Sequence, residues 1–218
     1  DAVLPRRQEC PAEGFIKLSE LRDIYEKSNA KPIDASNKLA PVFAISHFWR
    51  EQQHPDRNGE TLRIVGRALK ECMPKYADYG FWDVGIFFDW CSLHQNPRSP
   101  DEERCFDNSL AWINLWYVHA LTTVFLVIES RKGFEFAYHD RGWTSFEYQL
   151  SWLIKVSDKD NVWPQVVDLG REARGKPALA PLDAFHHGKL FGDKHFTNGA
   201  DRAKVARKFE ETCRDVFG

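Results

Sequence analysis

The sequence lacks most of the short motifs that identify a known type of enzyme. It has no glycine-rich phosphate-binding or dinucleotide-binding motif and no G-x-S-x-G element, which disfavours P-loop nucleotide hydrolases, dehydrogenases and α/β-hydrolases. Its five cysteines, at positions 10, 72, 91, 105 and 213, are odd in number, widely spaced and without a C-x-x-C pair. A disulfide framework and a zinc-finger-type site are therefore not expected, and a reducing, cytoplasmic compartment fits best.

The chain also lacks an excess of either charge and any long apolar run. Its 218 residues include 30 Lys and Arg against 32 Asp and Glu, whereas a dedicated nucleic-acid binder usually carries an excess of basic charge. No apolar run approaches the roughly 20 residues that span a bilayer. We therefore expect neither a nucleic-acid partner nor a membrane span. Because the first residue is Asp1, we interpret the sequence as an excised or processed piece of a longer chain.

Short apolar runs alternate with amphipathic segments along most of the sequence. Residues 1–40 are interpreted as an approach segment with one short helix, capped by Ser19. Residues 41–218 are interpreted as a single α/β domain with an irregular insertion at 170–197. We expect strands at 42–45, 84–88, 122–128 and 162–169, and helices at 61–73, 101–120, 143–154 and 201–217.

Continuous apolar strands that alternate with helices predict a parallel sheet covered by helices on both faces. The expected strand order is 2-1-3-4, to which a fifth strand can be added, and the fold class is a flavodoxin-like three-layer sandwich. Pro74 is expected to end the helix at 61–73. Residues 129–140 are expected to form a hairpin or an ordered loop. Trp112 and Trp116, beside the apolar stripe of the helix at 101–120, are expected to be largely structural, with packing as their role.

Polar side chains follow the predicted strands, where the working site of such a sheet lies. Ser46 and His47 end the first strand, and Asp89, with Cys91 close behind, follows the second. Glu147 lies early in the helix that follows the third strand. If the sheet is doubly wound, these side chains meet at one edge.

Several of these residues also have an ordinary structural interpretation. Glu147 completes the pattern T-S-F-E, in which Glu can reach back to cap its own helix, although Trp143 and neighbouring apolar residues would also desolvate it. Asp89 can cap a turn, and Cys91 is more simply a packing residue than the thiolate partner of His94.

Two further sets of residues were weighed as ligand-binding groups. Trp49 and Trp90 are core residues by default, with stacking on a flat ligand as the alternative. Four residues in the last third of the chain could in principle bind a metal, but a solvated loop is the simpler interpretation, so no metal site is predicted; they are His186, His187, Asp193 and His195.

Three blocks of the sequence, taken together, resemble the fungal heterokaryon-incompatibility (HET) domain. Residues 42–49 (VFAISHFW) resemble its opening block, residues 87–95 (FFDWCSLHQ) its second, and residues 141–147 (RGWTSFE) its third. The sequence departs from the pattern at Thr144, where many relatives have Cys, and at His47, where many have Tyr. The segment 148–218 matches none of the blocks.

The HET domain is in turn similar to the Toll/interleukin-1 receptor (TIR) fold, whose enzymatic members cleave NAD between nicotinamide and ribose. The resemblance implies Glu147 as the catalytic residue, in the Trp-x-x-x-Glu spacing that Trp143 begins. It further implies NAD as a substrate with no prosthetic group, self-association, and a role in signalling or cell death. The substrate-binding set that we infer on this basis comprises Ser46, His47, Trp49, Arg50, Asp89, Cys91 and Trp143.

The chemistry of that reaction suits a single carboxylate. Nicotinamide in NAD is already cationic and leaves without a general acid, while a carboxylate can stabilise the positive charge that develops on the ribose. Two alternatives remain open: a non-catalytic, self-associating signalling module, with Glu147 held in its capping box, and a nucleoside N-ribosyl hydrolase or transferase. Arg50, Arg57 or Arg98 at the site would favour a dinucleotide over a nucleoside.

Overall fold

A parallel β-sheet forms the centre of the computed structural model, which describes residues 3–29, 40–51, 53–78, 80–128, 137–155, 165–169, 176–177 and 190–218. The strands of these residues are β1 (Val42–His47), β2 (Gly85–Phe87), β3 (Thr123–Val127), β4 (Val166–Asp168) and β5 (Lys176–Pro177). They lie in the order β2-β1-β3-β4-β5, and only β5 runs antiparallel to its neighbour. The predicted order 2-1-3-4 is therefore confirmed, with a fifth strand at the edge.

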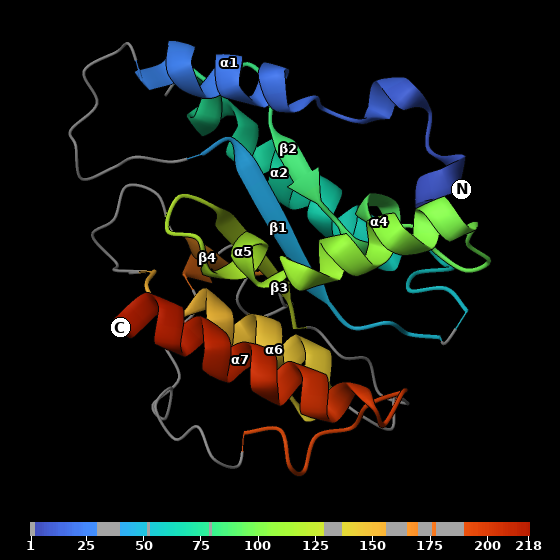
Figure 1. Cartoon of the computed structure of the whole chain (residues 1–218). Coiled ribbons are helices and arrows are strands. Elements are labelled where there is room, and N and C mark those ends of the chain that lie inside the picture. Colours follow the sequence, from blue (N-terminus) through green and yellow to red (C-terminus); the bar gives the residue numbers. More distant parts are fainter. Residues whose placement is uncertain are drawn as a thin grey trace.

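The two central strands are apolar along their length because both of their faces are covered. Every residue of β1 and of β3 is buried, and Ala44 of β1 pairs with Phe87 on one side and with Val124 on the other. This order, with helices on both faces, is the flavodoxin-like arrangement (Figure 1). It places the carboxyl ends of β1, β2 and β3 at one edge of the sheet.

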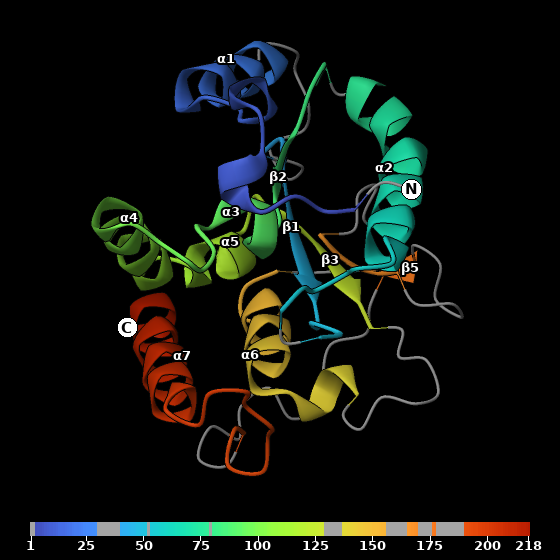
Figure 2. The same cartoon turned by 90° about the vertical axis from the view of Figure 1, so that its right-hand side faces the viewer.

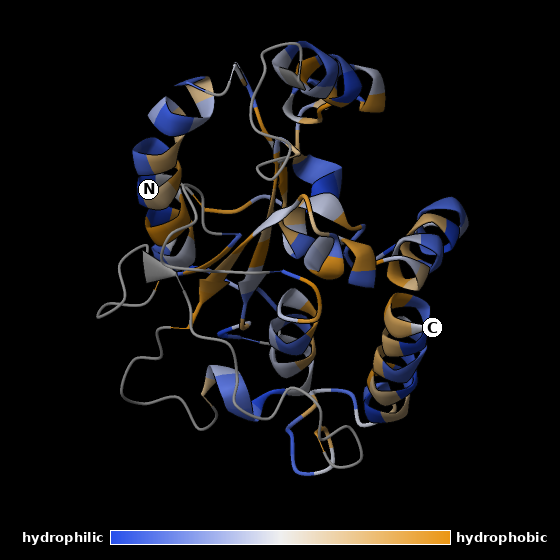
Figure 3. Ribbon diagram, turned by 90° about the vertical axis from the view of Figure 1, so that its left-hand side faces the viewer, coloured by the Kyte–Doolittle hydropathy of each residue, from blue (hydrophilic) through white to orange (hydrophobic). Residues whose placement is uncertain are grey.

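Helices flank the sheet in two layers, which Figure 2 shows on either side of the strands. One layer contains α2, with α1 beside the edge strand β2, and the other contains α5 and α6, with α7 outside them. Figure 3 shows mainly apolar colours on the strands and polar colours on the outward sides of the helices. The helices are α1 (Leu18–Asn29), α2 (Glu60–Asp78), α3 (Asp89–Ser92), α4 (Pro100–Ala111), α5 (Asn114–Val118), α6 (Gly142–Ser151) and α7 (Asp201–Phe217), with 3-10 turns η1 (Arg7–Glu9), η2 (Ala12–Gly14) and η4 (Tyr138–Asp140).

Alternate residues of the strands divide the core into two halves. Ala44, Val124 and Leu126 face the layer of α5, α6 and α7, where they pack with Phe146 and Phe209. Phe43, Ile45 and Phe125 face the opposite layer, where Tyr76 of α2 packs against Phe43 at a ring-centroid distance of 4.8 Å. The period of two residues along a strand thus decides which helix layer each side chain meets.

The prediction that Pro74 ends its helix is wrong, since α2 continues to Asp78. A proline inside a helix removes one backbone hydrogen bond and crowds the preceding turn. Tyr76, in the turn beyond it, is completely buried, and its hydroxyl bonds to Thr123 Oγ1 of β3 at 2.8 Å. Packing of this last turn on the sheet outweighs the cost of the proline.

The single helix expected at 101–120 is in fact two helices, and this changes the role of its tryptophans. α4 ends at Ala111 and α5 begins at Asn114. Trp112, at the break, is 66% exposed, so the expected packing role is wrong for this residue. Trp116 is 37% exposed but still packs against the protein. The break allows α5 to turn Tyr117 inward instead, while Trp116 stacks on Phe87 at 4.9 Å near the surface.

Three smaller expectations concern element ends. The helix that Ser19 was expected to cap begins one residue earlier, at Leu18, so Ser19 lies inside it. The expected hairpin is described only from residue 137 onward, and the insertion at 170–197 only at 176–177 and from 190 onward. The start of the fourth predicted strand, at 162–164, also lies outside the described residues.

Among the residues that are described, no helix is both long and apolar enough to cross a membrane.

Candidate functional site

The side chain of Glu147 is buried against the end of the central strand β1. Ser46 Oγ donates a hydrogen bond to Glu147 Oε2 at 2.6 Å, and the hydroxyl of Tyr138 bonds to the same serine oxygen. The hydroxyl of Tyr117, from α5, donates to the carbonyl of Ile45 at 3.4 Å and lies close enough to Glu147 to influence its pKa. Glu147 is 8% exposed, and Ser46 and both tyrosines are completely buried. Residues from β1, α5, η4 and α6 thus surround one carboxyl group.

The first turn of α6 directs Glu147 toward the sheet. The hydroxyl of Thr144 donates to the carbonyl of Tyr138, and that of Ser145 donates to the carbonyl of His139 at 2.8 Å. These bonds join α6 to the preceding turn η4. The helix begins at Gly142 after Arg141, so Thr144 is not its N-cap, and Glu147 bonds to Ser46 instead of to a cap. The capping-box interpretation of Glu147 is therefore wrong.

Burial raises the pKa of Glu147 to about 8. The hydrogen bond from Ser46 and the nearby hydroxyl of Tyr117 lower this pKa, and the negative charge of Asp89 raises it, but removal from water dominates. Burial also raises the pKa of Tyr117 and of Tyr138 well above the ordinary value. At neutral pH the carboxyl group of Glu147 is therefore mostly protonated.

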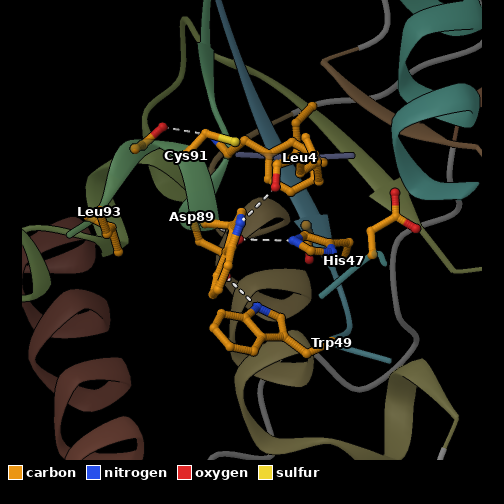
Figure 4. Close-up of polar contacts among 12 residues, drawn as sticks. Leu4, His47, Trp49, Asp89, Cys91 and Leu93 are labelled. Carbon is orange, nitrogen blue, oxygen red and sulfur yellow. Dashed lines mark hydrogen bonds and ion pairs between the residues drawn. The ribbon is translucent and has the colours of Figure 1, made fainter. Parts of the chain in front are cut away.

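A second carboxylate, that of Asp89, lies at the start of α3, directly after β2. His47 Nε2 donates to its Oδ1 at 2.9 Å and Trp49 Nε1 donates to its Oδ2 at 2.8 Å (Figure 4). The backbone N–H of Trp90 adds a bond to Oδ1 at 2.6 Å. Burial alone would raise the pKa of Asp89, but the charge of His47 and these three hydrogen bonds hold it below its ordinary value. Asp89 is thus ionised at neutral pH.

The imidazole of His47 is fixed by this contact. Because an ionised carboxylate can only accept hydrogen bonds, Nε2 of His47 carries the proton. The ring packs against Phe88 at a centroid distance of 4.5 Å, and its buried Nδ1 makes no hydrogen bond within the described part of the chain.

The two carboxyl groups have opposite protonation states although they are close enough to interact. The charge of Asp89 acts on both Glu147 and the adjacent Tyr117. Asp89 is stabilised as an anion by donors, whereas Glu147 is buried among neutral groups and keeps its proton. Paired titratable groups whose surroundings push their pKa values apart are typical of sites that perform acid–base or electrostatic catalysis.

The structure brings together four of the residues predicted to bind substrate. Ser46 contacts Glu147, and His47 and Trp49 contact Asp89. Trp90 is buried, which confirms its default interpretation as a core residue, and its indole N–H bonds to the carbonyl of Leu4 at 3.1 Å.

The other predicted binding residues are engaged elsewhere. Arg50 forms an ion pair with Glu60 at the start of α2, at 2.5 Å. Trp143 donates its indole N–H to Asp201 of α7 at 3.1 Å, which joins α6 to α7. Cys91 donates to the carbonyl of Pro5 at 3.2 Å.

The thiolate–imidazole pair, which was the less favoured interpretation of Cys91, is not formed, and two of the arginines considered for a dinucleotide have acidic partners. Burial raises the pKa of Cys91 to about 12, and His94 faces Glu102 at 3.3 Å, so they form no thiolate–imidazole pair. Arg57 pairs with Glu51 at 2.9 Å and Arg98 pairs with Glu103 at 2.6 Å, so neither brings an unpaired charge to the site.

Sequence reasoning missed the two tyrosines that complete the surroundings of Glu147. Tyr117 was interpreted only as part of an apolar helix stripe, and Tyr138 lies in a segment to which no role was given. The signal available for Tyr117 was a hydroxyl on the buried face of a helix, which usually has a polar partner. Nothing in the local sequence indicates that Tyr138 reaches Ser46.

Among the described residues, no group of three or more His, Cys, Asp or Glu side chains is placed to hold a metal ion. Two of the four metal-binding candidates, His186 and His187, lie outside these residues. His195 is described, and its carbonyl accepts the backbone N–H of Gly142 at 2.8 Å, beside the start of α6.

Comparisons of this chain with protein-family models, with curated proteins and with solved structures each found no match. The resemblance of three sequence blocks to HET and TIR domains therefore stays a prediction. What is known of the site rests on its geometry and its electrostatics.

Proposed function

We propose that this protein hydrolyses NAD at the bond between nicotinamide and ribose, with Glu147 as the catalytic residue. One observation carries the proposal: a buried, protonated carboxyl group lies within the field of an ionised one at the carboxyl edge of a parallel sheet. Ligands of such sheets bind at this edge. The arrangement matches the Glu147, Ser46 and Asp89 positions implied by the sequence resemblance.

A cationic ligand is the kind that this pair of groups favours. A pyridinium ring beside Asp89 and Glu147 is attracted by the negative charge of Asp89. Its positive charge lowers the pKa of Glu147, so that Glu147 loses its proton as the ligand binds. The resulting carboxylate faces the ribose. The indole of Trp49, held by its bond to Asp89, can stack on the flat ring.

The reaction then needs no proton donor for the leaving group. The bond between ribose C1′ and the nicotinamide nitrogen breaks with both electrons going to nitrogen, which neutralises the ring. Glu147 stabilises the positive charge on the sugar, water adds at C1′, and one proton is released. NAD and water thus give ADP-ribose, nicotinamide and a proton.

A second function is favoured by the protonated state of Glu147 itself. A neutral nucleoside requires protonation of its base as the N-glycosidic bond breaks, and a carboxyl group with a pKa of about 8 can supply that proton at neutral pH. The nucleoside N-ribosyl hydrolase or transferase is therefore the main competitor. The capping box that favoured a purely structural Glu147 is not formed, which weakens the case for a non-catalytic module.

Nicotinamide release tests the proposal directly. The full chain is incubated with NAD and free nicotinamide is measured by chromatography. We expect Glu147→Gln to lose roughly 10²-fold or more in rate, because removal of one preorganised electrostatic group typically has this effect. Glu210→Gln, an exposed change of the same chemistry on α7, should leave the rate unchanged.

The pH dependence separates the two enzymatic functions. If Glu147 acts as a carboxylate on NAD, kcat/KM rises about tenfold per pH unit and levels off near pH 8, since the pH dependence of kcat/KM reports the pKa values of groups in the free enzyme. If Glu147 acts as an acid on a neutral nucleoside, kcat/KM falls above pH 8. If the wild type releases no nicotinamide at any protein concentration, including under crowding, the proposal is overturned. The self-associating module is then favoured, and sedimentation would measure its self-association.

A further inference from the structure

The N-terminal segment crosses the turn that carries Asp89 and is held to it by several bonds. The carbonyl of Leu4 accepts the indole N–H of Trp90 and a ring nitrogen of His54, each at 3.1 Å. The side-chain amide of Gln8 makes two bonds to the backbone of Gln95, at 2.5 and 3.1 Å. The side chain of Leu4 is buried in the same core half as Trp90. Figure 4 shows Leu4 and Cys91 around the turn that begins at Asp89.

Two thiols from opposite sides of this contact bond to neighbouring carbonyls of the N-terminal segment. Cys91 Sγ donates to the carbonyl of Pro5 at 3.2 Å, and Cys10 Sγ donates to the carbonyl of Arg6 at 3.4 Å. These two carbonyls belong to successive residues, and each thiol is close enough to influence the pKa of the other. Both side chains are half-buried and both cysteines are reduced.

We propose that Cys10 and Cys91 form a reversible disulfide that fastens the N-terminal segment to the turn of Asp89. The bond requires two sulfur atoms that lie close together. The turn η1 is in contact with α3, and the two thiols bond to the carbonyls of the successive residues Pro5 and Arg6. Reversible disulfides of this kind occur in proteins of reducing compartments, where they serve redox sensing. The inference does not depend on the reaction proposed for Glu147.

The oxidation proceeds by exchange with a small disulfide such as oxidised glutathione. The thiolate of Cys10 attacks one sulfur of that disulfide, forms a mixed disulfide and expels one glutathione thiolate. Cys91 then attacks the sulfur of Cys10 and expels the second glutathione thiolate. Two protein thiols and one glutathione disulfide thus give one protein disulfide and two glutathione thiols.

The surroundings of the two thiols assign the order of these steps. Burial raises the pKa of both, that of Cys91 to about 12, while the charge of Arg7 partly offsets the rise at Cys10. Cys10 is the less deeply buried sulfur and is therefore the first to react. The same burial predicts that oxidation is slow at neutral pH and accelerates as the pH rises.

Alkylation and mass spectrometry test the disulfide in the full chain. The reduced protein, with Cys105→Ser to remove the exposed thiol, is incubated with oxidised glutathione at pH 8.5 and then alkylated with N-ethylmaleimide. We expect two of its four remaining thiols to escape alkylation, and tryptic peptides 8–17 and 76–98 to be linked. Dithiothreitol should restore all four alkylations.

Matched variants determine which thiols react. In Cys91→Ser we expect Cys10 to stop at the mixed disulfide with glutathione, whereas Cys213→Ser should leave the link between 8–17 and 76–98 intact. The oxidised protein should melt about 5–10 °C above the oxidised Cys91→Ser protein, because the bond closes a loop of about eighty residues. Full alkylation of Cys10 and Cys91 after exposure to the oxidant would overturn the proposal, as would links of either to Cys72 or Cys213.

Discussion

Replacement of Glu147 by Gln should stabilise the protein at alkaline pH, although it is expected to remove activity. In the folded protein the pKa of this carboxyl is about 8, whereas its ordinary value is 4.5. Below pH 4.5 the group is protonated in both the folded and the unfolded chain and costs nothing. Between pH 4.5 and 8 the unfolded chain loses this proton first, so the folded state becomes less stable as the pH rises.

The size of the effect follows from the difference between the two pKa values. Each pH unit within this window costs about 1.4 kcal/mol, which gives about 3 kcal/mol at pH 7 and about 5 kcal/mol above pH 8. Gln has no charge to bury. Its carbonyl oxygen can still accept the hydroxyl of Ser46, so near pH 5 the variant should match the wild type within about 1 kcal/mol.

Urea unfolding at pH 5, 6, 7 and 8 measures this directly. The difference in the free energy of unfolding between Glu147→Gln and the wild type cancels every other titrating group. We expect this difference to be near zero at pH 5 and to favour the variant by several kcal/mol at pH 8. Equal pH dependence of the two proteins, or a variant that is less stable at pH 8, would refute the assignment of a buried, protonated Glu147.

Three further predictions concern packing and one buried amine. Trp112→Ala should change the free energy of unfolding by less than about 1 kcal/mol because this side chain is 66% exposed, whereas Phe146→Ala should cost about 3–5 kcal/mol, and urea unfolding compares the two. A Cβ at Gly142 would lie 1.9 Å from the ring of Phe196, so Gly142→Ala should lower the free energy of unfolding by about 1–3 kcal/mol. The double variant with Phe196→Leu should recover part of this loss, and additive losses from the two substitutions would contradict the prediction. Burial holds the pKa of Lys155 well below its ordinary 10.5, so the wild type should gain stability over Lys155→Met as the pH rises from 7 to 9.5, and a constant difference would argue against a neutral, buried amine.

The order of the sheet could be predicted because the composition of each strand reflects how many of its faces are buried. A run such as residues 42–45 is apolar at every position, and only a strand covered on both faces accommodates that pattern. The alternation with amphipathic helices and the right-handed rule for parallel connections then leave few topologies. The ends of the helices were less predictable. Pro74 lies inside α2, and the helix expected at 101–120 divides at Trp112, because packing on the sheet outweighs local preference at both places.

The polar residues at the carboxyl edge of the sheet could be located from the sequence alone. Ser46 and His47 end an apolar strand and Asp89 comes just after another, so the direction of each strand places them at that edge. The same reasoning failed for Arg50 and Trp143, because it gives the location of the backbone but not the partner of a long side chain. Glu60 and Asp201, which bind them, come from separate helices.

The surroundings of Glu147 depend on the tertiary structure. The local pattern T-S-F-E fits a helix cap as well as a buried carboxyl, and the choice depends on Ser46, Tyr117 and Tyr138, which come from other elements. The raised pKa of Glu147 likewise arises from removal of water by side chains that are distant in sequence. The same holds for Cys10 and Cys91, whose proximity depends on the path of the N-terminal segment across the turn of Asp89. Local sequence sets backbone direction and apolar period, whereas desolvation and hydrogen-bond partners depend on the packing of the whole chain.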